Sequence, residues 1–240
     1  MNRNTTLLLA ASWMAGAIAA AAADAKDELI QAAKALAEKP NYSWVATVVV
    51  PEDAQFKPGP TEGKSEKDGY LMVSQSFGPS TMEIVKKGQQ AAITNPDGAW
   101  ETLEEAENAE GFGRFRAVLA RNLMAPAEDV IDMVEYMEEV QKEGPMYSGV
   151  LNEQGAKGMV SFRGRRGGGN NAGGPSIPFA EASAKFWVQD GVLSKMEVKV
   201  DGTLDFNGNE IPIVRTTTTE IKAIGSTRIQ VPEGASAKLK

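Results

Sequence analysis

The pattern that most constrains this chain is a pair of long strand-like segments joined by a tight turn near the C-terminal end. SAKFWVQ (183–189) and VLSKMEVKV (192–200) flank Asp190-Gly191, a dipeptide that two-residue hairpin turns favour. Read as a simple hairpin, the two segments carry apolar side chains on both faces, which predicts a sheet covered on both sides, in part by helices. The cross-strand pairs predicted by this hairpin are Trp187 with Ser194 and Val188 with Leu193.

Four consecutive threonines, Thr216 to Thr219, lie in the next strand-like segment, IPIVRTTTTEIKAI (211–224), which follows a turn at Asn207-Gly208. Such a run could be a patch of nucleophilic hydroxyls, or β-branched residues that favour an extended backbone. Alternate residues of a strand project to opposite faces, so the four hydroxyls cannot converge on one reacting atom. We therefore interpret the run as structural.

The first 23 residues have the pattern of a secretory signal peptide. Arg3 supplies a positive start, Leu7 to Ile18 an apolar run, and the alanines ending at Ala23 offer small-residue cleavage sites. A membrane anchor is the alternative, but the uninterrupted apolar run is shorter than the roughly 20 residues that a bilayer requires. We expect cleavage near Ala23 and a periplasmic or secreted protein, with residues 24–240 forming a single domain.

The charge of the mature chain limits its partners. Without residues 1–23 it keeps 24 basic against 32 acidic residues, a net charge of −8, which suits a soluble protein and disfavours nucleic acid as a partner. The chain has no cysteine, so it can neither form a disulfide nor be acylated at a cysteine after signal cleavage. We expect an unanchored monomer with at most transient contact with a membrane surface.

The first half of the mature chain reads as a helix followed by strands. Apolar spacing predicts a helix over Asp24 to Lys39, and alternation predicts a strand over Asn41 to Val50. Pro51 to Lys67 reads as a long loop. The further predicted strands, separated by Gly- and Pro-containing turns, are GYLMVSQSF, TMEIVKK, QAAITN and AWETL.

From Gly111 the period changes to that of helices. One helix is predicted after Gly111 and a second from Pro126 to Gly144, with a short one near Leu151 to Val160. Residues 163–175, which include Arg163, Arg165, Arg166 and several glycines, read as a flexible exposed loop. The acidic residues of the second helix read as a solvated face rather than a metal site; they are Glu128, Asp129, Asp132, Glu135, Glu138 and Glu139.

The composition excludes most hydrolase mechanisms. There is no histidine and no cysteine, which removes Ser-His-Asp and Cys-His catalysis and the usual nitrogen and sulfur ligands of zinc, copper or haem. No serine has a lysine three positions later. We expect no enzyme activity and no cofactor; a glycosidase-like pair of carboxylates is a weaker alternative.

The order of elements resembles the lipoprotein-carrier (LolA/LppX-like) superfamily. The local motifs that carry the resemblance are TTTTEIKAIGSTRIQVPEGA, GQQAAITNPDGAWETLEE, YSGVLNEQGAK and FWVQDGVLSKMEVKV. The resemblance implies an α+β fold in which a strongly curved antiparallel sheet, a half-barrel, has helices on its concave face and can enclose acyl chains.

These observations lead to a hypothesis of burial rather than chemistry. We expect a binding protein that holds a lipid, an acyl chain or a lipid-modified protein between sheet and helices. The alternative is a regulatory or scaffolding envelope domain with a solidly packed core that binds a protein. The candidate cavity residues are Trp44, Val48, Tyr70, Met72, Trp100, Trp187 and Met196, with Phe112, Phe115 and Leu119 as a helical lid.

Overall fold

The fold is described from a computed structural model of the 240-residue chain. It describes residues 10–54, 57–67, 69–77, 80–109, 113–161, 176–206 and 208–239. For residues 10–23 and Phe77 only the backbone is described. Phe112 and the predicted loop at 163–175 lie outside these residues.

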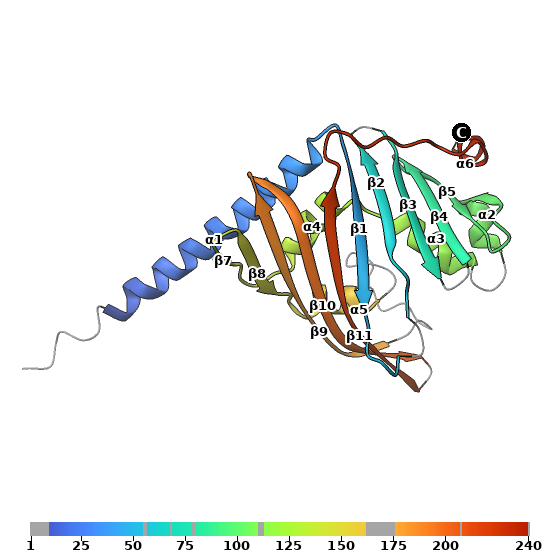
Figure 1. Cartoon of the computed structure of the whole chain (residues 1–240). Coiled ribbons are helices and arrows are strands. Elements are labelled where there is room, and N and C mark those ends of the chain that lie inside the picture. The colour runs from blue at the N-terminus through green and yellow to red at the C-terminus, as the bar shows by residue number, and fades with distance from the viewer. Residues whose placement is uncertain are drawn as a thin grey trace, which may run out of the picture.

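One antiparallel sheet of eleven strands forms the body of the described chain (Figure 1). Its spatial order is β6-β5-β4-β3-β2-β1-β11-β10-β9-β8-β7, so the first and last strands meet in the middle and the two edges are not joined. The predicted α+β half-barrel is therefore confirmed. The strands are β1 Asn41–Val49, β2 Thr61–Glu66, β3 Leu71–Phe77, β4 Ser80–Lys87, β5 Gln90–Thr94, β6 Trp100–Thr102, β7 Gln141–Glu143, β8 Met146–Val150, β9 Ser176–Gln189, β10 Val192–Phe206 and β11 Asn209–Lys222.

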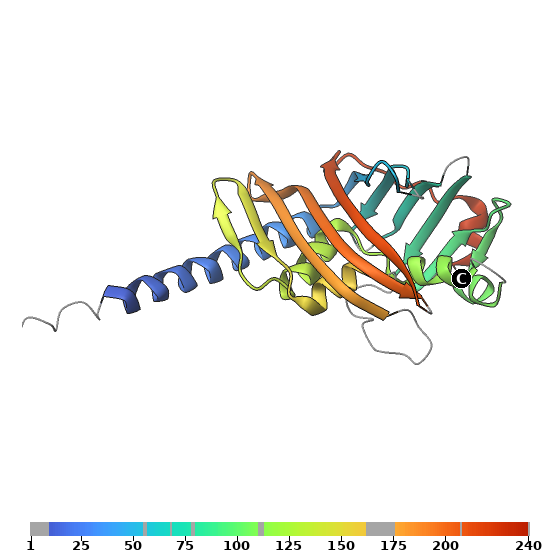
Figure 2. The same cartoon turned by 90° about the horizontal axis from the view of Figure 1, so that it is seen from below.

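Helices cover the concave face in two groups, which Figure 2 shows towards opposite ends of the sheet. The helices α2 and α3 pack on β4 and β5, whereas α1, α4 and α5 pack on the half that contains β8 to β10. The sixth helix, α6, packs on the other face, over β5 and β6. Their bounds are α1 Ala10–Ala37, α2 Leu103–Asn108, α3 Gly113–Asn122, α4 Pro126–Glu135, α5 Glu153–Val160 and α6 Glu233–Lys238.

The N-terminal helix is longer than predicted, because α1 begins at Ala10 and continues through Asp24 to Ala37. Its apolar residues Ala25, Leu29, Ala33 and Leu36 are buried in the largest hydrophobic cluster. Among the described residues, no helix combines the length and the apolar content that crossing a membrane requires.

Three predictions of local structure were wrong. The predicted loop at 51–67 contains β2, whose alternation is hidden because Thr61–Glu66 has few apolar residues. The second mid-chain helix ends at Glu135, and residues 141–150 form the β7–β8 hairpin, in which Gly144 has φ 60°. Asp132 does not lie on a solvated face, since only 3% of its surface is exposed.

The hairpin at Asp190-Gly191 forms with a bulge. Both turn residues have positive φ, as this turn requires, and Val188 pairs with Leu193 as predicted. Trp187 pairs with Lys195 instead of Ser194, because Ser194 is the extra residue of a bulge and its hydroxyl donates to the carbonyl of Trp187 at 2.9 Å.

Candidate functional site

The register of the central strands determines which side chains reach the concave face. Val48 on β1 pairs with Thr217 on β11, and Thr217 pairs with Val198 on β10, which is buried. Thr217 and Thr219 therefore face the helices, while Thr216 and Thr218 face the opposite side. The threonines alternate between the two faces of a strand, as predicted.

The half of this face near the start of β1 is filled by side chains. Tyr42 and Trp44 are 2% and 5% exposed and pack with Val130, Met133 and Val134 of α4. The Tyr42 hydroxyl is positioned at the start of α4, where Ala125 provides no side-chain cap and the backbone N–H of Ala127 bonds to the tyrosine oxygen. Burial raises the pKa of Tyr42 to about 12. This half of the face is hydrophobic core.

The other half of the central strands is less buried. We define the open segment as the concave-face residues Val48 on β1, Thr61 on β2 and Ile211, Ile213, Arg215 and Thr217 on β11. Ile211 is 40% exposed and the other five are half-buried. Among the residues that the structure describes, Val48 belongs to none of the three hydrophobic clusters and packs against none of them.

The open segment is an extended strip of the concave face. From Ile211 to Thr217 it follows one strand for a length of about 20 Å, at about 3.3 Å per residue. It lies between the α3 group and the α5 group of helices, and none of the described helices packs on Val48 as part of a core cluster. One end carries the apolar side chains of Ile211 and Ile213, Arg215 follows, and the other end combines Val48 with the hydroxyls of Thr217 and Thr61.

Two basic side chains of the concave face attach helices by donating to carbonyls at helix C-termini, where positive charge is favourable. Lys86 Nζ bonds to the carbonyls of Arg121 and Leu123 at 3.1 and 3.0 Å, at the end of α3, and burial lowers the pKa of Lys86. Arg215 Nη2 bonds to the carbonyl of Met159 in the last turn of α5 at 2.6 Å. The Arg215 contact holds the end of α5 at the open segment, whereas the strand register places Lys86 at the level of Tyr42, in the filled half of the face.

The predicted site residues do not lie on one face. Trp44 and Met196 lie in the concave core at 5% and 8% exposure, and Val48 lies in the open segment. On α3, Leu119 packs on the β4–β5 end and Phe115 is half-buried. The remaining four lie on the convex face: Tyr70, Met72 and Trp100 pack beneath α6, and Trp187 lies under Lys195 Nζ, 4.6 Å from its ring.

Sequence reasoning missed the polar part of the open segment. Ile213, Arg215 and Thr217 are every second residue of β11 and therefore lie on one face. This spacing is visible in the sequence IPIVRTTTT. Which face turned towards the helices depended on the pairing of β11 with β1, which joins residues more than 160 positions apart.

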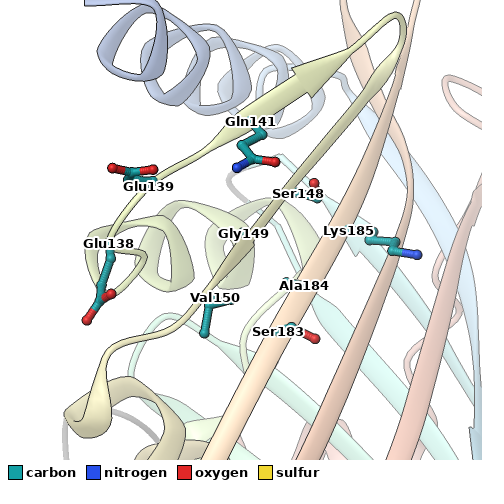
Figure 3. Close-up of a pocket in the computed structure, with 9 residues that line it drawn as sticks. All are labelled: Glu138, Glu139, Gln141, Ser148, Gly149, Val150, Ser183, Ala184 and Lys185. Carbon is teal, nitrogen blue, oxygen red and sulfur yellow. The ribbon is translucent and has the colours of Figure 1, made fainter. Parts of the chain in front are cut away.

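Two surface pockets lie away from the open segment. One, of about 340 Å³, lies at the β7–β9 edge, and Figure 3 shows the charged ends of Glu138 and Lys185 pointing away from each other there. The other, of about 720 Å³, lies between Pro40, Glu66 and residues 225–229, where the side-chain oxygen of Asn41 accepts from the N–H of Thr227 at 2.8 Å. In the described part of the chain no group of three or more acidic residues could hold a metal ion.

Neither a protein-family model nor a curated protein sequence matches this chain. Two solved structures are similar to it over most of its length. LprF from Mycobacterium bovis is 11% identical, with a TM-score of 0.44, covering 89% of this chain and 98% of LprF. The Mycobacterium tuberculosis lipoprotein LppX is 9% identical, with a TM-score of 0.44, covering 88% of this chain and 99% of LppX. The similarity is one of fold.

Proposed function

We propose that this protein is an exported, non-catalytic binding protein that holds the acyl chain of a lipid or of a lipid-modified protein on the open segment. The observation that carries the proposal is the position of Val48. It faces the concave side beside Thr217, yet it is half-buried and packs against no hydrophobic cluster of the described residues. An acyl chain lying over Val48 and Ile213 would remove their apolar surface from water, at about 25 cal/mol per Å².

The packing of the rest of the face supports this location. Trp44 and Met196 are already covered by other side chains, so a ligand between them and α4 would have to displace core residues. A ligand on the open segment would contact residues that are still partly exposed. The absence of histidine and cysteine from the sequence supports a role in burial rather than catalysis.

Export and solubility are parts of the same proposal. Cleavage near Ala23 would leave the packed part of α1, including Ala25 and Leu29, in the mature chain. The mature protein would then be periplasmic or secreted, unanchored and monomeric, with transient contact with a membrane when it takes up or releases its ligand.

The second candidate is a scaffolding domain that binds a protein, and the dense packing around Trp44 favours it. In that case the open segment would be covered by a segment of the partner protein instead of an acyl chain. Both candidate functions use the same face of the sheet, so identifying the molecule that binds there distinguishes them.

The test uses two adjacent valines on opposite faces. Val48→Lys places a charge in the open segment, whereas Val49→Lys changes a convex-face residue that is 64% exposed and serves as the matched control. Delipidated wild type and both variants are mixed with 1-monooleoylglycerol, a neutral single-chain lipid, and analysed by native mass spectrometry without detergent. We expect a one-to-one adduct for wild type and V49K and at least a tenfold loss for V48K, roughly the effect of placing a charge in an apolar contact.

A bare polypeptide mass for wild type would contradict the proposal and favour the scaffold. Equal binding by V48K and V49K would place the lipid elsewhere. Circular dichroism and thermal melts of the variants establish that a lost adduct does not reflect unfolding.

A further inference from the structure

A single cation faces the concave side within the open segment. Arg215 pairs with Val200 of β10, so its side chain leaves the sheet on the same face as Ile213 and Thr217. It is half-buried, and its Nη2 reaches the carbonyl of Met159 on α5 at 2.6 Å. The guanidinium therefore lies at the border between the open segment and α5.

The charge of Arg215 has no carboxylate partner among the described residues. The ion pairs formed by those residues all involve other side chains. Residues 162–175, which join α5 to β9, contain no Asp or Glu and so supply no carboxylate by sequence. The Met159 carbonyl uses one of the five N–H donors of the guanidinium.

A second arginine, Arg116, provides a contrast. Arg116 on α3 bonds to the Glu101 carboxylate at 3.0 Å and to the Thr94 carbonyl at 2.9 Å, so its charge is neutralised by a neighbour. Within the described part of the chain, the negative charge that faces Arg215 is the partial charge at the end of α5. Burial lowers the pKa of Arg215, but an arginine remains charged in proteins. A half-buried guanidinium with unused donors is suited to bind an anion.

We propose that the ligand of the open segment is an anionic amphiphile whose carboxylate or phosphate binds Arg215 while its acyl chain contacts Val48 and Ile213. This inference rests on the proposed function, because it assigns a head group to the ligand proposed there. The shared chemistry is a set of anionic oxygens, which the planar guanidinium can bind through two N–H groups. A fatty acid and a phospholipid are the two sources that supply it.

The competing role for Arg215 is structural, as a cap for the C-terminus of α5. Two substitutions separate the roles. Arg215→Gln retains a hydrogen-bond donor for the Met159 carbonyl but removes the charge, and Arg215→Lys retains the charge but not the planar fork. Arg228→Gln changes an exposed arginine after β11 by the same net charge and is the matched control.

The experiment compares three single-chain probes with the same oleoyl tail: oleate, 1-oleoyl lysophosphatidate and neutral 1-monooleoylglycerol. Dissociation constants are measured with delipidated full-length mature protein by native mass spectrometry and by displacement of a fluorescent acyl probe. We expect wild type and R228Q to bind at least one anionic probe about tenfold or more tightly than the neutral one. R215Q should lose this preference with unchanged affinity for 1-monooleoylglycerol, and R215K should keep part of it.

The outcomes separate this inference from the proposed function. Equal binding of all three probes to wild type, or an unchanged preference in R215Q, overturns the role of Arg215 and leaves acyl binding in place. Failure of all three probes to bind wild type overturns the proposed function itself. Preference for oleate alone identifies a fatty acid, and preference for lysophosphatidate alone identifies a phospholipid.

A salt titration keeps the inference testable if R215Q does not fold. The affinity of wild type for the anionic probe should fall as the salt concentration rises, while that for 1-monooleoylglycerol should not. Affinities that respond to salt in the same way for the charged and neutral probes would contradict a charge-mediated contact.

Discussion

Trp44 lies directly over Gly63 on the neighbouring strand. The two residues are opposite one another in the β1–β2 register, and a Cβ added to Gly63 would lie 2.0 Å from Cζ2 of the indole. Gly63 is thus the position at which the sheet leaves room for the largest side chain of its concave core.

Replacing Gly63 by alanine should destabilise the protein by about 1–3 kcal/mol, because the added methyl overlaps the indole of a buried residue. The measurement is the free energy of unfolding in urea. In a Trp44→Leu background the same substitution should cost less, since the leucine lacks the ring atoms that cause the overlap. An equal cost in both backgrounds would assign the effect to the strand backbone instead.

Alkaline pH should reduce the contribution of Tyr42 to the stability of the folded protein. Its pKa is raised from 10.0 to about 12 by burial, so its contribution to stability is complete below pH 10 and is lost as the pH rises from 10 towards 12. Y42F should be less stable than wild type by about 1 kcal/mol at neutral pH, because the hydroxyl contacts at Ala127 and Ser65 are lost. This difference should narrow above pH 10; parallel stability curves for the two proteins would contradict the assignment.

Acid should remove the stabilisation of the folded protein that comes from the contact between α1 and the β7–β8 hairpin. Glu28 accepts from the Tyr147 hydroxyl at 2.6 Å and pairs with Lys142, and these two partners lower the pKa of Glu28 below its ordinary value of 4.5. The stabilisation is therefore present above pH 4.5 and lost as the pH falls through the lowered pKa. E28Q should melt at a lower temperature than wild type at neutral pH, by a small amount because the pair is exposed.

The control for this prediction is Glu62→Gln, on an exposed side chain of β2 that forms no ion pair among the described residues. Its melting temperature should follow that of wild type at every pH. The prediction is wrong if E28Q still melts at a lower temperature than wild type in strong acid.

The C-terminal helix should matter for stability although it is short. Ala235 is fully buried against Val85 and Ala92, whereas Ala237 on the same helix is exposed. Ala235→Glu should cost about 2 kcal/mol or more, because it places a carboxylate in an apolar contact, and Ala237→Glu should be nearly neutral. Chemical denaturation of both variants checks this, and equal stability would show that α6 is detached in solution.

Much of the element order could be predicted because it depends on local rules. The hairpin at Asp190-Gly191 follows from a dipeptide that tolerates positive φ, and α4 begins at Pro126 because proline suits the first turn of a helix. The errors arose where the local signal was weak or overridden. The polar strand β2 forms because its backbone pairs with β1 and β3, and the bulge at Ser194 shifts a register that the turn alone would have set.

The sequence by itself determined most of the strands and turns, the exclusion of histidine and cysteine chemistry and the opposite directions of neighbouring threonines. Only the tertiary structure decided which of these side chains face the helices. The pairing of β1 with β11 directs Val48, Arg215 and Thr217 to the concave side, and α6 covers Trp100 on the other. The physical reason is that a strand shows a period of two but not which of its faces will be buried; that depends on partners distant in the chain.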